Sequence, residues 1–455
     1  MNLPRYMILS FSLLMINLSC SDFLETDLPK DQLDQVKVFN DAATAEAAMN
    51  NVYVMLVEGG FLNGNTADNP FLMACYTDEL EVISTQNTDP RKFYDAVILA
   101  DNTAVKRLWD TSYKQIYTVN NIIEGVESSP NLSETTKNKL MGEALAIRGI
   151  LHFYLTQTFD EVPYIKTINY NLNKSIAKQN SNEVMNLAIA DLKEAELLLN
   201  AEVANTERIR INKPVVQAFL ARIYLYQKKW IESLQYAELV INNPLFELEP
   251  VETLFLKESK SAILQLKPTI NGYNTYEAMT YIFTANPAPI AQLSQSLLND
   301  FETDDLRKTQ WVKFVGDTGT NAHAFKYKQR GFSSPTKEYS IVIRIEEMYL
   351  IAAEAEGQLG NWTNFNNYLN TIRTRANISA LDISDNNLAQ NAILSERRIE
   401  FFCEFGHRFY DLKRTNKLMS LATVKPHWMD YFKNLPIPQT EILLNGNLKP
   451  QNIGY

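Results

Sequence analysis

Residues 212–243 read NKPVVQAFLARIYLYQKKWIESLQYAELVINN, and this stretch decides the fold class. Small, aliphatic and aromatic residues recur there three or four positions apart, which is the spacing of one face of an α-helix. Val216 and Leu220 share a face in the first half, and Trp230 and Leu234 share a face in the second. The stretch therefore predicts a pair of helices that pack against each other through these faces.

The same helical spacing recurs along most of the chain, whereas alternation with a period of two is rarely long enough for a sheet. Ser128-Ser129-Pro130 separates one predicted pair of helices, and Gly360-Asn361 separates another. Because residues 212–243 are similar to a tetratricopeptide unit, we predict a mostly α fold of tetratricopeptide-like helical repeats. The irregular spacing of the pairs indicates that the array is interrupted. The further predicted helices cover residues 106–123, 137–154, 182–198, 345–359 and 362–372.

Two segments, residues 59–95 and 244–337, lack clear helical periodicity. The longer one is rich in Pro, Gly, Tyr and Asn, and it contains too many aromatic residues for a disordered chain. Long irregular segments of folded domains are frequently functional. We therefore predict that residues 20–455 form one superdomain, in which a helical scaffold at 100–243 and 338–455 carries a ligand-binding surface on these two segments.

Aromatic residues in the two irregular segments stand where no periodic face requires them. Aromatic rings in open clefts suit sugars, because sugar C–H groups pack on a ring face while hydroxyl groups bond to nearby polar side chains. Ordinary loop packing is the alternative for each residue. The candidate ligand-binding residues are Tyr273, Tyr276, Tyr281, Trp311 and Phe332 in the longer segment, and Arg91, Phe93 and Tyr94 in the shorter one. The polar side chains available nearby are Gln86, Asn87, Asn271, Asn274, Asn286 and Asn321.

The first twenty residues have the pattern of an export signal. Arg5 is followed by an apolar run at residues 6–18, which is too short for a membrane span of about 20 helical residues. Cys20 follows the small residue Ser19 at the end of this run, which is the arrangement that lipoprotein signal peptidase requires. We predict a signal peptide at residues 1–19 and acylation of Cys20, which would hold the protein on a membrane. An ordinary secretory peptide, cut elsewhere, is the alternative.

Charge and cysteine usage argue against nucleic acid as a partner and against a disulfide framework. The chain has 43 Lys and Arg against 53 Asp and Glu, a formal net charge of −10. It offers no basic stripe that would neutralise phosphate groups. Apart from Cys20, the sequence has only Cys75 and Cys403, which are far apart, so we predict two buried free thiols.

A charged string, ERRIEFFCEFGHRFYDLKR at residues 396–414, could be an active site with paired carboxyl groups. Glu396, Glu400 and Glu404 are four residues apart, which would place them on one helical face. A general acid needs a carboxyl group free of cationic partners, so we predict instead a salt-bridge network that holds a late helix to the repeats. The sequence has no HExxH, clustered Cys and His, GxSxG or Walker motif. We therefore predict that the protein is not an enzyme and uses neither a metal nor another cofactor.

Three blocks of sequence together resemble the SusD/RagB family of nutrient-binding lipoproteins. The blocks are WDTSYKQIYTVNNII at 109–123 with EALAIRGILHFYLTQTFDEVP at 143–163; MYLIAAEAEGQLG and LNTIRTRA within 344–376; and the string at 396–414 with LPIP at 435–438 and QNIGY at 451–455. The last block is the most specific, because helical periodicity does not require it. Ile453 stands where the family usually has Pro.

The resemblance implies a surface lipoprotein of the outer membrane that captures a nutrient, with an oligosaccharide or polysaccharide as the leading ligand. It also implies a partner, a SusC-like TonB-dependent β-barrel transporter over which the lipoprotein sits as a lid. Capture of a peptide is the alternative within the family. A hydrolase and a helical-repeat scaffold for other proteins are the alternatives outside it.

Overall fold

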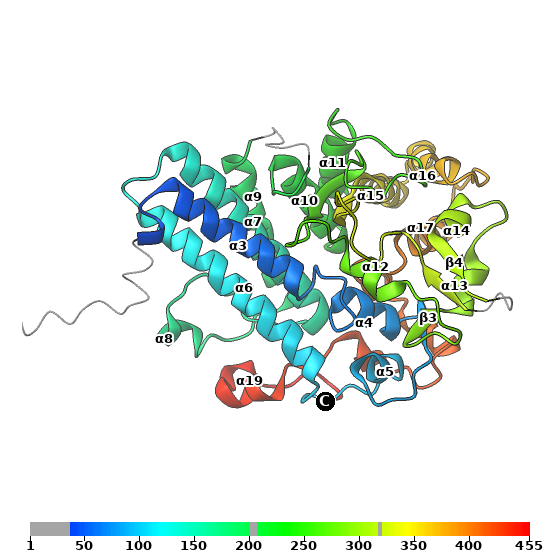
Figure 1. Cartoon of the computed structure of the whole chain (residues 1–455), viewed down its shortest axis with the longest axis horizontal. Helices are drawn as coiled ribbons and strands as arrows, with labels where there is room; N and C mark the ends of the chain where they lie inside the picture. Colours follow the sequence, from blue (N-terminus) through cyan, green and yellow to red (C-terminus); the bar gives the residue numbers. More distant parts are fainter. Residues whose placement is uncertain (1–36, 201–206, 317–320) are drawn as a thin grey trace, which may run out of the picture.

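The computed structural model describes residues 37–200, 207–316 and 321–455 (Figure 1). The predicted signal peptide at residues 1–19 and the predicted acylation site Cys20 lie outside these ranges. Long helices gather on the left of Figure 1, and shorter helices and strands gather on the right. The described chain is mostly helical, which confirms the predicted fold class.

Four long helices form one end of the molecule. The pair α6 and α7 is antiparallel and confirms the pair predicted on either side of Ser128-Ser129-Pro130. Both helices begin at a side-chain cap, because Asn102 and Ser133 accept hydrogen bonds from backbone N–H groups of the first turn. α3 packs along α6, and α9 packs on α7 (Figure 1). The four helices are α3 (Ala42–Glu58), α6 (Thr103–Ser128), α7 (Glu134–Phe159) and α9 (Ser181–Leu198).

Two helical pairs continue the array, and they confirm the repeats predicted at residues 212–243 and 345–372. In the first pair, Ser233 on the second helix donates a hydrogen bond to the backbone oxygen of Ala221 on the first. The second helix of this pair packs directly on the first helix of the next pair, although about a hundred residues separate them in the sequence. The array is therefore interrupted in sequence but continuous in space. The pairs are α10 (Lys213–Tyr226) with α11 (Trp230–Ile241), and α15 (Ile345–Gln358) with α16 (Trp362–Arg375).

Short strands tie the irregular segments to the scaffold and to each other. In the described ranges they form three antiparallel sheets of two strands. Leu80 pairs with Leu293, so the shorter segment is joined to the longer one, and Ala262 pairs with Arg344 at the entrance to α15. The sheets are β1 (Leu80–Val82) with β3 (Ala291–Leu293), β2 (Ala262–Leu266) with β6 (Ser340–Arg344), and β4 (Val312–Phe314) with β5 (Ala322–Ala324).

Short helices occupy much of the two segments that have weak periodicity in the sequence. Helices of six to eight residues complete about two turns, so they cannot display a recognisable apolar face. Those in the segments are α4 (Asn69–Tyr76), α5 (Asp89–Tyr94), α12 (Tyr276–Tyr281), α13 (Gln295–Asp300) and α14 (Leu306–Trp311). The other elements are α8 (Tyr170–Asn173), α17 (Asn386–Phe401), α18 (His407–Arg414), α19 (Gln439–Leu444) and the 3₁₀ helices η2 (Leu418–Thr423), η3 (Asp430–Lys433) and η4 (Gly446–Leu448).

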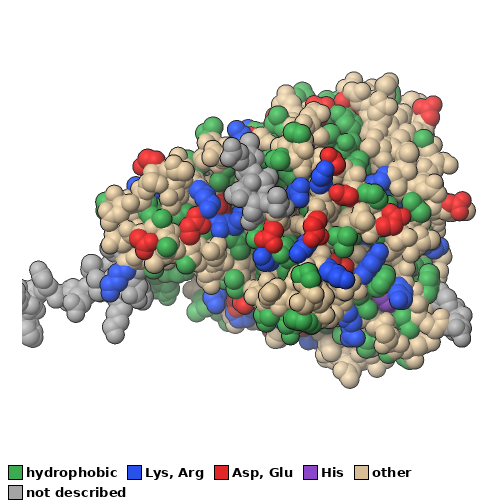
Figure 2. All heavy atoms as spheres, turned by 45° about the horizontal axis from the view of Figure 1, so that its top comes forward, with side chains coloured by type: hydrophobic (Ala, Val, Ile, Leu, Met, Phe, Trp, Pro, Cys, Tyr) green, Lys and Arg blue, Asp and Glu red, His purple; other side chains and the backbone are tan. Residues whose placement is uncertain are grey.

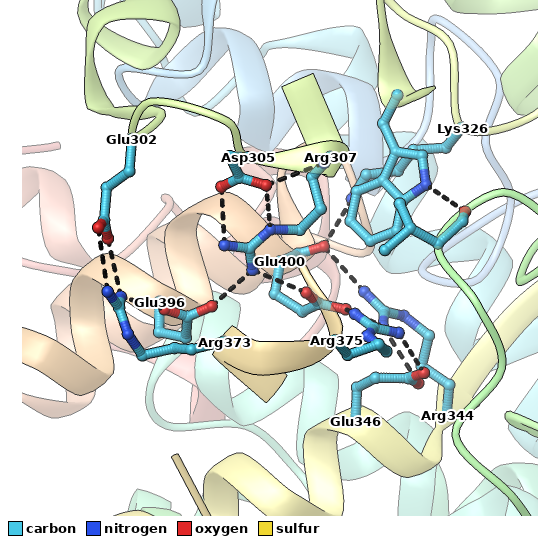
Figure 3. A network of polar contacts seen from close by, with 12 residues as sticks. Glu302, Asp305, Arg307, Lys326, Arg344, Glu346, Arg373, Arg375, Glu396 and Glu400 are labelled. Atoms are coloured by element: carbon cyan, nitrogen blue, oxygen red, sulfur yellow. Dashed lines mark hydrogen bonds and ion pairs between the residues drawn. The ribbon is translucent and has the colours of Figure 1, made fainter. Parts of the chain in front are cut away.

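A buried network of ion pairs fixes α17 against the rest of the core (Figure 3). Glu400 on α17 accepts hydrogen bonds from Arg307 at 2.9 Å, and from Arg344 and Arg375 at 2.6 Å each. Glu396, one turn earlier, accepts another from Arg307 at 2.6 Å. These arginines come from α14, from the residue before α15 and from the end of α16, so one helix binds the longer irregular segment and two parts of the scaffold. The predicted salt-bridge network is confirmed.

The exposed surface carries both signs of charge. Figure 2 shows Lys and Arg side chains interspersed with Asp and Glu on the face drawn, without a broad area of either sign. Within the described residues, helices long and apolar enough to cross a membrane are absent. The two remaining cysteines, Cys75 and Cys403, are buried free thiols, as predicted.

Candidate ligand-binding site

Three of the eight candidate ligand-binding residues lie in the core, which corrects their assignment to a binding surface. Trp311, Phe93 and Tyr281 have almost no exposed surface. The indole Nε1 of Trp311 donates a hydrogen bond to the backbone oxygen of Val251 at 2.9 Å, and the ring packs edge-on against Phe255. A ring enclosed in this way has no free face for a ligand. The burial of Trp311 could not be predicted from the sequence, because α14 is too short to show which of its sides is buried.

Phe93 and Tyr281 hold the irregular segments to the core instead. The Phe93 ring packs edge-to-face on Tyr76, with 5.7 Å between the ring centroids. Tyr281 donates a hydrogen bond from its hydroxyl group to the backbone oxygen of Cys403 at 3.3 Å, and its ring lies 5.7 Å from that of Phe71. Since Phe71 is on α4 and Tyr281 on α12, the two segments lie side by side (Figure 1).

Arg91 and Tyr94 are partly exposed on α5, but they line two hollows that are separate from the pocket described next. Arg91 forms a bidentate ion pair with Asp95, with both N···O distances at 2.6 Å. Cations already contact the Tyr94 ring, since the Arg91 guanidinium lies 5.2 Å and the Lys425 Nζ 4.1 Å from its centroid. Tyr94 lines a hollow of about 830 Å³ and Arg91 lines one of about 420 Å³, and neither hollow shares a lining residue with the pocket described next. The candidate residues therefore divide between separate places.

A pocket of about 190 Å³ opens beside Tyr273 and Tyr276, and we refer to it as the ligand pocket. Both irregular segments contribute to its wall, through residues 62–64 of the shorter one and residues within 266–279 of the longer one. Most of the wall is apolar, and Tyr273 remains 45% exposed. This is the place where the structure brings together the two segments that were predicted to form a binding surface.

Phe332 extends the rim of the ligand pocket. It is 68% exposed, and its ring meets that of Tyr273 edge-on with 6.2 Å between the centroids. The ring lies against Gly272, whose φ of +87° suits glycine, and a Cβ at that position would come within 2.1 Å of the Phe332 ring. The two exposed rings thus form one aromatic edge beside the ligand pocket.

The amide side chains of the ligand pocket are used to hold its loops. Asn274 donates hydrogen bonds to the backbone oxygen of Gly331 at 3.0 Å and to Ser333 Oγ at 2.9 Å. Its own oxygen accepts hydrogen bonds from the backbone N–H groups of Lys337 and Glu338. Elsewhere in the longer segment, Asn321 donates a hydrogen bond to Asn286. These three amides, which the sequence offered as ligand partners, therefore stabilise the loops.

Glu277 is a residue of the ligand pocket that the sequence did not reveal. It lies in the first turn of α12, lines the pocket and is almost fully buried. Ser340 Oγ donates a hydrogen bond to its Oε1. Burial raises the pKa of this carboxyl group to about 7, the Ser340 hydrogen bond opposes that rise, and Glu404 and Glu338 add to it. No sequence signal marks Glu277, because its burial depends on contacts with residues that are distant in the sequence. Ser340 lies 63 positions away, and Gly64 is more distant still.

The described residues contain no group of three or more His, Cys, Asp or Glu side chains that could hold a metal ion. The acidic and basic residues of the charged string are instead paired with one another and with the scaffold. Arg397 binds Asp411, and Arg414 binds both Asp411 and Glu354, with distances of 2.5 to 2.8 Å. The chemistry that the ligand pocket offers is therefore apolar contact plus one carboxyl group.

Two family models match the sequence. One, described as starch-binding and associating with the outer membrane, matches residues 22–225, and one described as the SusD family matches residues 309–455. The chain is 26% identical to SusD-like protein P2 of Formosa agariphila over the full length of both proteins. It is 21% identical to SusD-like protein P25 of the same organism, over 98% of this chain and 97% of that protein.

Solved structures share the fold at lower sequence identity. A SusD superfamily protein of Bacteroides vulgatus superposes with a TM-score of 0.81 at 22% identity, covering 91% of this chain and 99% of that one. A laminarin-binding SusD-like protein gives a TM-score of 0.76 at 21% identity, with 91% and 99% coverage. A SusD-like carbohydrate-binding protein of Bacteroides fragilis gives 0.77 at 19% identity, with 90% and 100% coverage.

Proposed function

The chain belongs to the SusD/RagB family, and on that premise we propose that it is a surface lipoprotein that binds an oligosaccharide or polysaccharide in the ligand pocket. The observation that carries this proposal is the exposed aromatic edge of Tyr273 and Phe332 beside an apolar pocket. Sugar C–H groups pack on such ring faces, while the outward hydroxyl groups stay in water.

The size of the ligand pocket suits part of a long ligand rather than a whole small one. Sites that enclose drug-sized molecules have volumes of roughly 300–1,000 Å³, whereas this pocket has about 190 Å³. One sugar unit or chain end would enter it, and the rest of the chain would lie outside along Tyr273 and Phe332. A glycan polymer is a ligand of that shape.

Binding without chemistry is the activity that we propose. Glycoside hydrolysis uses two carboxyl groups on either side of the scissile bond. The two carboxyl groups with an electrostatic effect on Glu277 are both occupied. Glu404 accepts hydrogen bonds from Lys326 at 2.5 Å and Arg344 at 3.0 Å, and Glu338 accepts two from backbone N–H groups. A second carboxylate free to act as base or nucleophile is therefore lacking at Glu277 among the described residues.

A peptide is a less suitable ligand for the same pocket. Extended peptides are recognised through hydrogen bonds to their backbone, for which Asn and Gln amides are suitable partners. The two amides that line the ligand pocket, Asn63 and Asn274, already bond to the protein itself. Apolar contact with rings requires no such partners, which favours a glycan.

The lipid anchor and the partner complete the proposal. Acylation of Cys20 would hold the protein at the outer membrane, and the ligand would pass to a SusC-like TonB-dependent transporter. Support comes from the apolar run at residues 6–18, which Ser19 and Cys20 follow, and from the family description, which mentions association with the outer membrane. A Cys20→Ala variant is expected in the soluble fraction after membranes are washed free of protein complexes. Retention of the variant in the washed membranes would contradict the anchor.

The ligand proposal is tested by glycan-array screening, with laminarin among the neutral glucans, followed by calorimetric titration. Replacing Tyr273 and Tyr276 together by Ala should weaken binding by about 1 kcal/mol for each ring lost, or roughly 30-fold in total. Tyr170→Ala is the matched control, because Tyr170 is 75% exposed on α8, away from the lining of the ligand pocket. Unchanged affinity in the double variant would place the glycan elsewhere, and binding of peptides alone would overturn the ligand class.

A further inference from the structure

The carboxyl group of Glu277 has unused hydrogen-bonding capacity. Ser340 Oγ donates to its Oε1, whereas its Oε2 has no hydrogen-bond partner among the described residues, although the side chain is only 5% exposed. Leaving a buried polar atom unpaired costs roughly 1–3 kcal/mol. Native proteins rarely keep such an atom unless a water molecule, an ion, another bound molecule or a functional role accounts for it.

The other buried polar side chains in the wall of the ligand pocket are already satisfied. Asn63 donates a hydrogen bond to the backbone oxygen of Val57, and its own oxygen accepts one from the backbone of Asn65. Asn274 uses both ends of its amide group, and Thr275 accepts a hydrogen bond from the backbone of α12. Among the buried lining residues that the structure describes, Glu277 is therefore the group left to bond a ligand.

The surroundings of Glu277 favour its neutral form. Burial is the largest cause of the raised pKa of about 7. Lys326 is the nearby cation, and its Nζ is already bound to Glu404 and to the backbone oxygen of Glu400. Burial also raises the pKa of Tyr281, Tyr327 and Cys403, so these groups are uncharged at neutral pH. The titratable groups that face Glu277 from the neighbouring elements are Tyr281, Lys326, Tyr327, Glu338, Cys403 and Glu404.

Gly64 allows the chain to approach this carboxyl group. A Cβ at Gly64 would lie 2.4 Å from Cδ and 2.8 Å from Oε1 of Glu277, so any larger residue would displace the carboxyl group. Glu277 also lines a cavity of about 10 Å³ behind the pocket, close to the size that holds one water molecule. The terminal torsion of a glutamate is broad, so rotation can turn either oxygen toward the ligand pocket.

We propose that Glu277 is the polar anchor of the ligand pocket and binds a hydroxyl group of an uncharged sugar through its unpaired oxygen. The protonated carboxyl group is the form suited to this contact. A carboxylic acid donates through O–H and accepts through C=O, whereas a carboxylate only accepts. A ligand that enters the pocket also excludes water, which disfavours the charged form further. The inference rests on the proposed glycan binding and adds its ligand class, neutral sugars rather than sugars that carry carboxylate or sulfate groups.

Calorimetric titration of the mature chain with laminarin at pH 6 and pH 8 tests the proposal. The neutral fraction of a group with a pKa of about 7 falls about tenfold over this range, so the affinity should fall about tenfold. In Glu277→Gln the affinity should be independent of pH, because an amide donates and accepts without titrating. Glu302→Gln, which removes a half-exposed carboxyl group outside the pocket, should keep the wild-type pH profile.

The wild-type protein supplies a second measurement that does not depend on the folding of a variant. Titrations at pH 7 in buffers of different ionisation enthalpy should show uptake of about half a proton for each ligand bound. A polyuronate should bind more weakly than the neutral glucan at pH 8.

Different outcomes overturn the inference and the proposed function. An affinity that is constant or rises from pH 6 to pH 8, or proton release on binding, would overturn the role of Glu277. So would a Glu277→Gln variant that retains the wild-type pH profile. If the double variant of Tyr273 and Tyr276 loses affinity in that case, the proposed function stands without the anchor. Absence of binding to any neutral glycan would overturn both.

Discussion

Glu400 and Glu277 are both buried glutamates, yet their surroundings give them opposite properties. Glu400 is fully buried on α17 and accepts hydrogen bonds from Arg307, Arg344 and Arg375. Burial alone would raise its pKa, but the guanidinium groups of Arg375, Arg344 and Arg307 outweigh that and hold the pKa well below its usual range. Glu277 has no ion pair with a cation among the described residues, and its pKa is raised to about 7. Burial thus raises the free energy of the charged carboxylate, and the cationic partners decide whether that increase is offset.

The difference separates a structural carboxyl group from one that is available to a ligand. In the network around Glu400, ion pairs to Arg307, Arg344 and Arg375 join α17 to α14, β6 and α16 (Figure 3). The ligand pocket has one carboxyl group with an unpaired oxygen beside apolar walls. The ion-pair network around Glu400 therefore supports the ligand pocket, since Arg344 is the last residue of β6 and Ser340 is the first residue of the same strand.

The largest expected effect on stability comes from disrupting the ion-pair network around Glu400. Glu400→Gln would leave three buried arginines without their shared negative charge, and removal of one partner from a buried pair costs about 3 to 5 kcal/mol. The free energy of unfolding in urea measures this loss. Glu302→Gln is the control, because Glu302 is 49% exposed where it pairs with Arg373, and an exposed pair is worth about 1 kcal/mol or less. Equal losses in the two variants would mean that burial does not distinguish these ion pairs.

The second prediction concerns the opposite pH dependence of the two glutamates. The pKa of Glu277 is raised in the folded protein from 4.5 to about 7, so the folded state binds more protons in that window and stability falls as the pH rises through it. The shift corresponds to roughly 3 kcal/mol. Glu400 behaves in the opposite sense, because its pKa is lowered, and its contribution is lost as the pH falls below about 4.5.

Glu277→Gln removes the contribution of Glu277 to the pH dependence of stability. Relative to the wild type, the variant should have similar stability at pH 5 and gain up to about 3 kcal/mol at pH 8, where the wild-type carboxyl group would be charged. Urea unfolding at several pH values measures the difference between the two curves. A constant difference from pH 5 to pH 8 would show that Glu277 titrates at its ordinary pKa.

The smallest effect compares a core aromatic residue with a rim aromatic residue. Trp311→Phe replaces the buried indole by a smaller ring and leaves the backbone oxygen of Val251 without its donor, at a cost of about 2 kcal/mol, without changing the affinity for glycan. Phe332→Ala should change stability by about 0.5 kcal/mol or less, because the ring is exposed, and should weaken glycan binding instead. Thermal unfolding and calorimetric titration of both variants decide the matter. Loss of affinity in Trp311→Phe at unchanged stability would return Trp311 to the binding surface.

The sequence by itself determined the helical scaffold and the role of the charged string. Helices such as α7 and α10 are long enough for the spacing of their apolar residues to identify them, and the residues that cap them directly precede them in the sequence. The ion pairs around Glu400 could be predicted from the charged string, because its acidic side chains lie beside basic ones. Cys20 remains a sequence prediction.

Only the tertiary structure decided which aromatic residues are exposed beside the pocket and which of its buried carboxyl oxygens lacks a partner. No periodic apolar face in the sequence requires either Trp311 or Tyr273. In the structure, Val251 and Phe255 enclose Trp311, whereas Tyr273 lines the ligand pocket. Glu277 is a buried acid with one unpaired oxygen, Oε2, because Gly64 and Ser340, from opposite sides in the sequence, pack around it. Exposure in short elements is set by contacts between distant segments, and local periodicity contains no information about those contacts.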